Sequence, residues 1–145
     1  STMERVSRDG LCMQIAQLVA NRGTCSRAQV GAVLARDGRI LATGYNGPPS
    51  GFPHCTDPNG CTDDDRNSLT GCVRAVHAEA NAIAYAARHG IATQGSNLYC
   101  SHLPCRKCAE LIINAGISTV YYCLDYRIKD GWILLQQAGI DMMKL

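Results

Sequence analysis

Four residues in two short segments carry the side chains of a hydrolytic zinc site. His77 and Glu79 form a His-x-Glu pair, and Cys105 and Cys108 follow Pro104 in a Pro-Cys-x-x-Cys segment. Catalytic zinc takes three protein ligands and keeps a fourth position for water, and one histidine with two cysteines is an established set. Glu79 is then left as a carboxylate that can move protons between water and a substrate. The combination predicts a metal-assisted hydrolase.

Each piece of this pattern has an ordinary interpretation when it is taken alone. A Cys-x-x-Cys pair also occurs in structural zinc knuckles and in redox sites. A histidine in a helix is most often a packing or surface residue, and His-x-Glu arises by chance in many chains. The joint occurrence of both segments, in this order, is typical of zinc nucleobase deaminases.

The elements that must position these residues alternate between helices and strands. A first helix is predicted after a cap at Ser7 or Asp9, with a stop at Gly23. The dipeptide Asp37-Gly38 indicates a tight hairpin. Periodicity predicts strands at residues 30–35, 40–45, 98–101, 119–124 and 140–143, helices at residues 75–89, 105–115 and 130–138, and a long irregular loop at residues 46–71.

This order of elements predicts an α/β fold with one mixed sheet and helices on both faces. His77 and Glu79 are expected in the first turn of the helix at residues 75–89. Cys105 and Cys108 are expected on one face of the first turn of the next helix. Because helix N-termini favour thiolates over thiols, this placement assists metal binding.

Length and charge limit the remaining possibilities. The chain has 145 residues, 14 Lys and Arg, 12 Asp and Glu, and a formal net charge of +2. We expect a single domain over residues 3–145, with Ser1 and Thr2 as an expression scar. The basic residues form no stripe, so long nucleic acid is not an expected partner. No apolar stretch is long enough for a membrane span, and no leader pattern is visible, which favours a cytoplasmic protein with reduced cysteines.

A second group of cysteines precedes the helix at residues 75–89. Four thiolates can close a structural zinc site that would restrain the long loop. His54 is the expected substitute ligand, and the alternative is a set of ordinary buried thiols. Three further cysteines, Cys12, Cys100 and Cys123, are expected in the core. The residues of the predicted second zinc site are Cys25, Cys55, Cys61 and Cys72.

Three segments make the sequence resemble the deoxycytidylate deaminases of the cytidine deaminase superfamily. They are residues 44–51 (GYNGPPSG), residues 77–83 (HAEANAI) and residues 104–117 (PCRKCAELIINAGI). The resemblance runs from about Leu11 to the end of the chain, and the Gly-Tyr-Asn-Gly segment is its most discriminating part. It implies a three-layer α/β/α cytidine deaminase fold around a five-stranded mixed sheet.

The resemblance also implies a reaction, the hydrolysis of dCMP to dUMP and ammonia that supplies dUMP for thymidylate synthesis. Zinc on the His77, Cys105 and Cys108 ligands would activate water, and Glu79 would carry the protons. Asn46 would bind the deoxyribose hydroxyl, and the Ala78 amide would bind the pyrimidine O2. Candidates for the 5′-phosphate are Arg27 and Tyr126.

Our expectations about regulation and assembly rest on the same resemblance alone. It implies a homo-oligomer, specifically a hexamer, with dCTP and dTTP as magnesium-bound effectors.

Two other functions use similar residues. A deaminase of single-stranded nucleic acid or tRNA would share the zinc chemistry but needs basic and aromatic tracking groups, whereas this chain has one Phe and one Trp. A non-enzymatic, zinc-stapled interaction module would leave Glu79 without a role.

Overall fold

Helices and strands follow the order expected from the sequence. A computed structural model describes residues 4–25, 28–55, 57 and 75–145. The predicted loop at residues 46–71 therefore lies partly outside the described residues. The described elements are α1 (Arg8–Ala20), β1 (Gly31–Arg36), β2 (Arg39–Tyr45), α3 (Ala78–Arg88), β3 (Asn97–His102), α4 (Arg106–Asn114), β4 (Thr119–Leu124), α5 (Asp130–Gln137) and β5 (Asp141–Lys144).

The five strands form one mixed sheet in the order β2-β1-β3-β4-β5. β1 is antiparallel to both of its neighbours, β2 and β3, whereas β3, β4 and β5 run parallel. The hairpin between β1 and β2 turns at Asp37 and Gly38, with φ angles of 53° and 75°. Two residues with positive φ are what a tight hairpin requires, which explains the Asp-Gly signal. The predicted five-stranded mixed sheet is confirmed.

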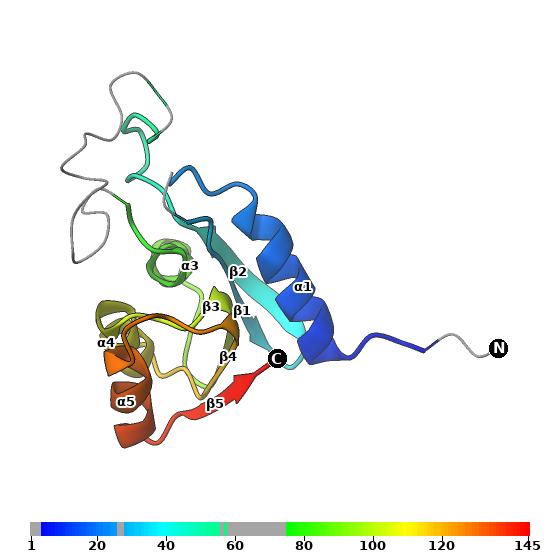
Figure 1. Ribbon diagram of the computed structural model, residues 1–145. Helices are drawn as coiled ribbons and strands as arrows, with labels where there is room; N and C mark the ends of the chain where they lie inside the picture. Colours follow the sequence, from blue (N-terminus) through cyan, green and yellow to red (C-terminus); the bar gives the residue numbers. More distant parts are fainter. Residues whose placement is uncertain (1–3, 26–27, 56, 58–74) are drawn as a thin grey trace.

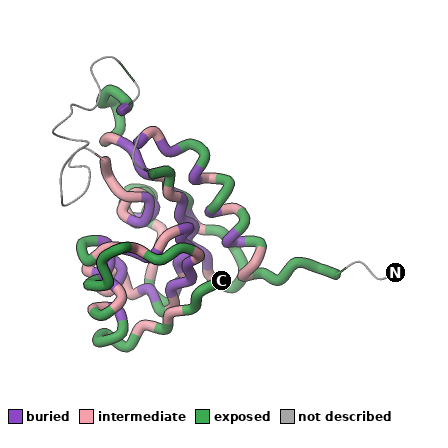
Figure 2. The backbone as a smooth tube through the Cα atoms, viewed as in Figure 1, coloured by how far each residue is buried: buried purple, intermediate pink, exposed green. Residues whose placement is uncertain are grey.

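Helices cover both faces of this sheet, so the molecule has three layers (Figure 1). α1 packs on one face, whereas α3, α4 and α5 lie on the other. Successive strand residues serve opposite faces: Val33 and Tyr99 pack under α1, while Leu34 and Leu98 pack under the three other helices. The buried backbone in Figure 2 accordingly runs along the sheet and the inner faces of the helices. The three-layer α/β/α fold is confirmed.

A hydrogen bond ties α1 to the sheet. Ser7 caps the helix, since its side chain accepts a hydrogen bond from the Gly10 N–H at 2.9 Å. Two residues later, the Asp9 carboxylate accepts a hydrogen bond of 2.5 Å from the Tyr99 hydroxyl on β3. Tyr99 also stacks on Tyr121 of β4 with 4.6 Å between ring centroids. Burial, with help from Asp9, raises the pKa of Tyr99, so the hydroxyl remains a donor.

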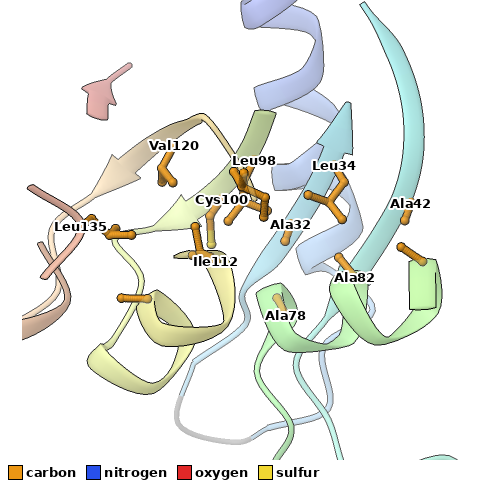
Figure 3. Packing of buried hydrophobic residues seen from close by; sticks show 13 residues of the cluster. Ala32, Leu34, Ala42, Ala78, Ala82, Leu98, Cys100, Ile112, Val120 and Leu135 are labelled. Atoms are coloured by element: carbon orange, nitrogen blue, oxygen red, sulfur yellow. The ribbon is translucent and has the colours of Figure 1, made fainter. Parts of the chain in front are cut away.

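Small residues let α3 approach the sheet very closely. Ala78 and Ala82 face β1 and β2 in the core, next to Ala32 and Ala42 (Figure 3). A Cβ atom added to Gly44 of β2 would lie 2.3 Å from the Ala78 carbonyl oxygen. Because only a hydrogen atom fits there, the contact at Gly44 fixes the distance between β2 and the first turn of α3.

Two helices begin later than the sequence pattern predicts. α3 starts at Ala78 rather than at residue 75, and α4 starts at Arg106 rather than at residue 105. His77 and Cys105 have extended backbones and occupy the N-cap positions just outside the helices. Neither residue is a favoured cap, so the apolar periodicity alone could not mark these starts. Glu79 and Cys108 do lie in first turns, as predicted.

No described helix has both the length and the apolar character that crossing a membrane requires.

The contact between β2 and α3 predicts the effect of enlarging Gly44. We expect Gly44→Ala to lower the free energy of unfolding by about 1–3 kcal/mol or more, because the added methyl group meets backbone atoms that cannot turn away. Chemical denaturation would measure this loss. Thr43→Ala, at the neighbouring exposed position, is the control and should change stability by no more than about 0.5 kcal/mol. Equal effects of the two substitutions would contradict the close contact.

Candidate active site

The starts of α3 and α4 meet at one place in the structure. His77 and Cys105 are the N-cap residues of these helices, and neither caps its helix through a side-chain hydrogen bond. The first backbone N–H groups of both helices therefore have no side-chain cap from these residues. Such helix ends carry partial positive charge, which favours anionic ligands and thiolates beside them.

The three predicted zinc ligands lie together here. The Nδ1 atom of His77 is 3.4 Å from the Cys105 Sγ and 3.4 Å from the Cys108 Sγ. All three ligand atoms lie within 4.8 Å of one another. A tetrahedral zinc ion with Zn–S near 2.3 Å and Zn–N near 2.0 Å places sulfur and nitrogen about 3.5 Å apart. The donor set and its spacing therefore fit zinc with one position left open.

The two thiols influence each other strongly. A hydrogen bond from Cys108 lowers the pKa of Cys105 to about 4, and His77 acts in the same direction. Hydrogen bonding to Cys105 and burial raise the pKa of Cys108. The pair alone thus holds one negative charge readily and resists a second. A divalent cation between the two sulfur atoms supplies the charge that the second thiolate needs.

Glu79 is buried beside this group, with 3% of its surface exposed. Burial raises the pKa of its carboxyl group, although its own backbone N–H and the His77 ring act in the opposite direction. A raised pKa brings the carboxyl group closer to the pH at which it can both accept and release protons. Its place within the first turn of α3 keeps it adjacent to the ligands without being one of the three.

A pocket of about 290 Å³ opens onto these residues. Ala78, Glu79, His77 and Cys105 form one part of its lining, and Asn46 forms another. The remaining lining residues come from the segments before β1 and before α3 and from the end of β3 and the segments that follow β3 and β4; they are Cys25, Ala28, Val30, Ala75, His102, Leu103, Tyr126 and Arg127. The predicted site residues Asn46, Ala78, Glu79 and Tyr126 therefore share one pocket.

Asn46 has a structural task in addition to its place in the pocket. Its Nδ2 group donates to the Ala28 carbonyl oxygen at 2.6 Å, and its Oδ1 atom accepts from the Val30 N–H at 2.8 Å. The Thr24 N–H also donates to the Asn46 carbonyl oxygen. Asn46 thereby fastens the pocket wall to the end of β2. One amide hydrogen and one lone pair of the side chain are left for a ligand.

The second predicted zinc site is only partly within reach of the structure. Cys25 and Cys55 are both buried and form no disulfide. Cys61, Cys72 and the phosphate candidate Arg27 lie outside the described residues. His54 is exposed, and its backbone N–H donates to the Asp57 carboxylate. The second zinc site stays a prediction. Cys12 and Cys100 are buried as expected, whereas Cys123 is only half-buried.

Sequence reasoning missed two polar residues of the pocket, His102 and Arg127. His102 ends β3, and its partner across the parallel pair is Leu124 at the end of β4. Arg127 follows three residues later. Ligand sites in α/β proteins commonly lie at the carboxyl ends of parallel strands, so the strand pattern held a usable signal for both.

Comparison with known proteins identifies the family. The family model described as the cytidine and deoxycytidylate deaminase zinc-binding region matches residues 6–124. The chain belongs to this family. As a family member it is a zinc-binding deaminase, which favours an enzyme over an interaction module.

Individual relatives and solved structures are similar to nearly the whole chain. ComE operon protein 2 of Bacillus subtilis is 42% identical over 97% of this chain and 72% of its own length. The deoxycytidylate deaminase of Enterobacteria phage T4 is 33% identical over 92% of this chain and 87% of its own. The crystal structure of the cyanophage S-TIM5 dCMP deaminase with dCMP and dUMP has a TM-score of 0.83 and 36% identity, covering 99% of this deaminase and all of the cyanophage chain.

The two cysteine groups predict the metal content of this deaminase. We expect close to two zinc ions per chain when the protein is purified without chelator, one for each group. Cys55→Ser should reduce this value to one, and Cys108→Ser should remove the other ion. Elemental analysis of both variants and the parent makes the measurement. A parent value near one would leave the loop cysteines as plain thiols, and loss of both ions in Cys55→Ser would contradict independent sites.

Proposed function

We propose that this deaminase hydrolyses dCMP to dUMP and ammonia. The observation that carries the proposal is a single pocket that joins the zinc-ligand group and Glu79 to Tyr126 and Arg127. Such a pocket offers hydrolytic chemistry at one part and a cation for a phosphate at another. Relatives named as deoxycytidylate deaminases, and the dCMP and dUMP complex of the cyanophage enzyme, support the same substrate.

His77, Cys105 and Cys108 would hold the catalytic zinc. When bound, the ion supplies Lewis-acid activation of a water molecule in its open position. Glu79 would accept the proton from that water and deliver it to N3 of the cytosine ring. It would then take the proton of the hydroxyl group added at C4 and pass it to the amino group, which leaves as ammonia. Its burial suits this cycle, because a carboxyl group with a raised pKa binds and releases protons more evenly near neutral pH.

Asn46 and Ala78 would orient the nucleoside part of the substrate. The free hydrogen-bonding capacity of the Asn46 side chain would meet the deoxyribose hydroxyl. The Ala78 N–H, at the start of α3, would meet the pyrimidine O2. Since Asn46 also fastens the pocket wall and Ala78 is fixed by its contact with β2, both groups are held rigidly before substrate arrives.

Tyr126 and Arg127 would receive the 5′-phosphate. Arg127 is the one Arg or Lys among the described residues that line the pocket, and a guanidinium group matches the geometry of phosphate oxygens. This places a cation next to the predicted ligand Tyr126. The earlier candidate Arg27 can act with them, since it precedes the pocket residue Ala28 by one position.

Several finer expectations accompany the reaction and stay predictions. They are supply of dUMP for thymidylate synthesis, a second structural zinc, dCTP and dTTP effectors with magnesium, a homohexamer, and a cytoplasmic location. The effector expectation concerns the Gly-Tyr-Asn-Gly segment. Gly44, Tyr45 and Gly47 line a second hollow of the described surface together with Asn81 and Tyr85.

If Glu79 carries protons without binding the metal, its substitution should abolish turnover and leave the zinc content unchanged. Glu79→Gln should retain the zinc and the fold but lose at least about 100-fold in turnover, because the amide cannot exchange protons. His77→Ala should instead lose the catalytic zinc. Ammonia release and zinc content would be measured on the same preparations. If Glu79→Gln kept more than a few per cent of the activity, another group would have to carry the protons.

A panel of substrates tests the proposed function. We expect dCMP to be turned over far better than deoxycytidine, because phosphate binding energy orients the distant ring. CMP should be disfavoured, and a short single strand should not react. Tyr126→Phe, Arg127→Ala and Arg27→Ala should reduce turnover of dCMP and barely change that of deoxycytidine. Equal activity on the nucleoside and the monophosphate would reject the proposal, and preference for a strand would indicate a nucleic-acid deaminase.

A further inference from the structure

A short chain of hydrogen bonds crosses from β1 to β3 at the edge of the pocket. The Gly31 N–H, at the start of β1, donates to the Ser101 Oγ at 3.1 Å. The same Oγ lies 3.0 Å from the Nδ1 atom of His102. Ser101 is buried, with 6% of its surface exposed, whereas His102 lines the pocket. The chain therefore connects a backbone amide in the core to an imidazole at the ligand site.

This arrangement favours one of the two positions for the hydrogen of the neutral His102 ring. The Ser101 oxygen already accepts a hydrogen from Gly31, and its own hydroxyl hydrogen needs an acceptor. Among the described hydrogen bonds of Ser101, Nδ1 of His102 is the available acceptor. In a neutral imidazole an accepting Nδ1 leaves the hydrogen on Nε2. Burial lowers the pKa of His102 and so favours this neutral form.

Strand register places His102 near the proposed phosphate ligands. His102 pairs with Leu124 across the parallel strands, and the Leu103 N–H donates to the Leu124 carbonyl oxygen at 2.7 Å. Tyr126 and Arg127 lie two and three residues after Leu124 on the chain and line the same pocket. Three polar side chains from two neighbouring strand ends thus face one volume.

We infer that His102 is a substrate-contacting residue that donates a hydrogen bond from Nε2 to the 5′-phosphate, beside Arg127, with Ser101 and Gly31 fixing its tautomer. The inference rests on the proposed function. A neutral donor next to a guanidinium group gives a directed hydrogen bond without a second full charge. His102 then selects the monophosphate over the nucleoside, and Ser101 acts as a positioning residue.

A purely structural role for the same three residues makes a different prediction. If His102 only tied β3 to β1, its loss would lower stability and reduce the turnover of every substrate alike. A phosphate contact instead changes the ratio of kcat/KM for dCMP to that for deoxycytidine. This ratio is the decisive readout.

Two substitutions of similar polarity separate these roles. In His102→Gln, the side-chain amide nitrogen reaches the place of Nε2, so the dCMP to deoxycytidine ratio should stay within about threefold of the parent. In His102→Asn, the amide reaches only the place of Nδ1, so the ratio should fall by about 10- to 100-fold. His89→Gln and His89→Asn, at the exposed end of α3, are matched controls and should leave the ratio unchanged.

Each outcome of this experiment decides the inference. Zinc content and the thermal midpoint, measured on every variant, identify any loss of fold. An unchanged ratio in His102→Asn, or an equal fall in both His102 variants, would overturn the phosphate contact. A parallel loss on both substrates would assign His102 to structure. If the parent enzyme released no ammonia from dCMP, the proposed function itself would fail, and the inference with it.

Discussion

Much of this structure follows from the requirement that two helix starts meet without side-chain caps. The N–H groups in the first turns of α3 and α4 concentrate partial positive charge, and the N-cap positions that normally hold Ser, Thr or Asp are given to His77 and Cys105. Two stabilising cap interactions are thereby replaced by predicted metal ligands. The three-layer packing, with its small residues between α3 and the sheet, keeps these two ends together.

The rest of the pocket comes from strand ends that are distant in the sequence. Asn46 closes β2 and fastens the segment before β1, while His102 and Arg127 stand at or beyond the ends of the parallel strands β3 and β4. The position of the proposed phosphate ligands is thus set by strand register, whereas the position of the predicted zinc ligands is set by the helix starts. A shift in the strand register or in the helix starts would separate the reacting carbon of the proposed substrate from the groups that orient it.

Elements with strong local signals could be predicted from the sequence, and contacts that depend on register could not. Asp37-Gly38 located the hairpin, and the strand at residues 119–124 matches β4 at both ends. The predicted starts of α3 and α4 were wrong by one to three residues, since a histidine or cysteine at an N-cap does not look like a cap. The hydrogen bonds of Asn46 join residues 16 and 18 positions apart, and no periodicity reports such pairs. His102 and Arg127 belong to no motif, and only the pairing of β3 with β4 brings them to the same pocket.

The separation of His77 from the two cysteines along the chain affects how the enzyme is made on the ribosome. When the first two strands and α3 have emerged, the growing chain presents one of the three ligands of the predicted catalytic site, the His77 imidazole, which alone holds zinc weakly. The two sulfur ligands appear about thirty residues later and reach the imidazole only after α4 has docked on the sheet. The predicted catalytic zinc therefore finds its complete ligand set only late in biosynthesis, and we expect an incomplete chain released before α4 is formed to lack deaminase activity.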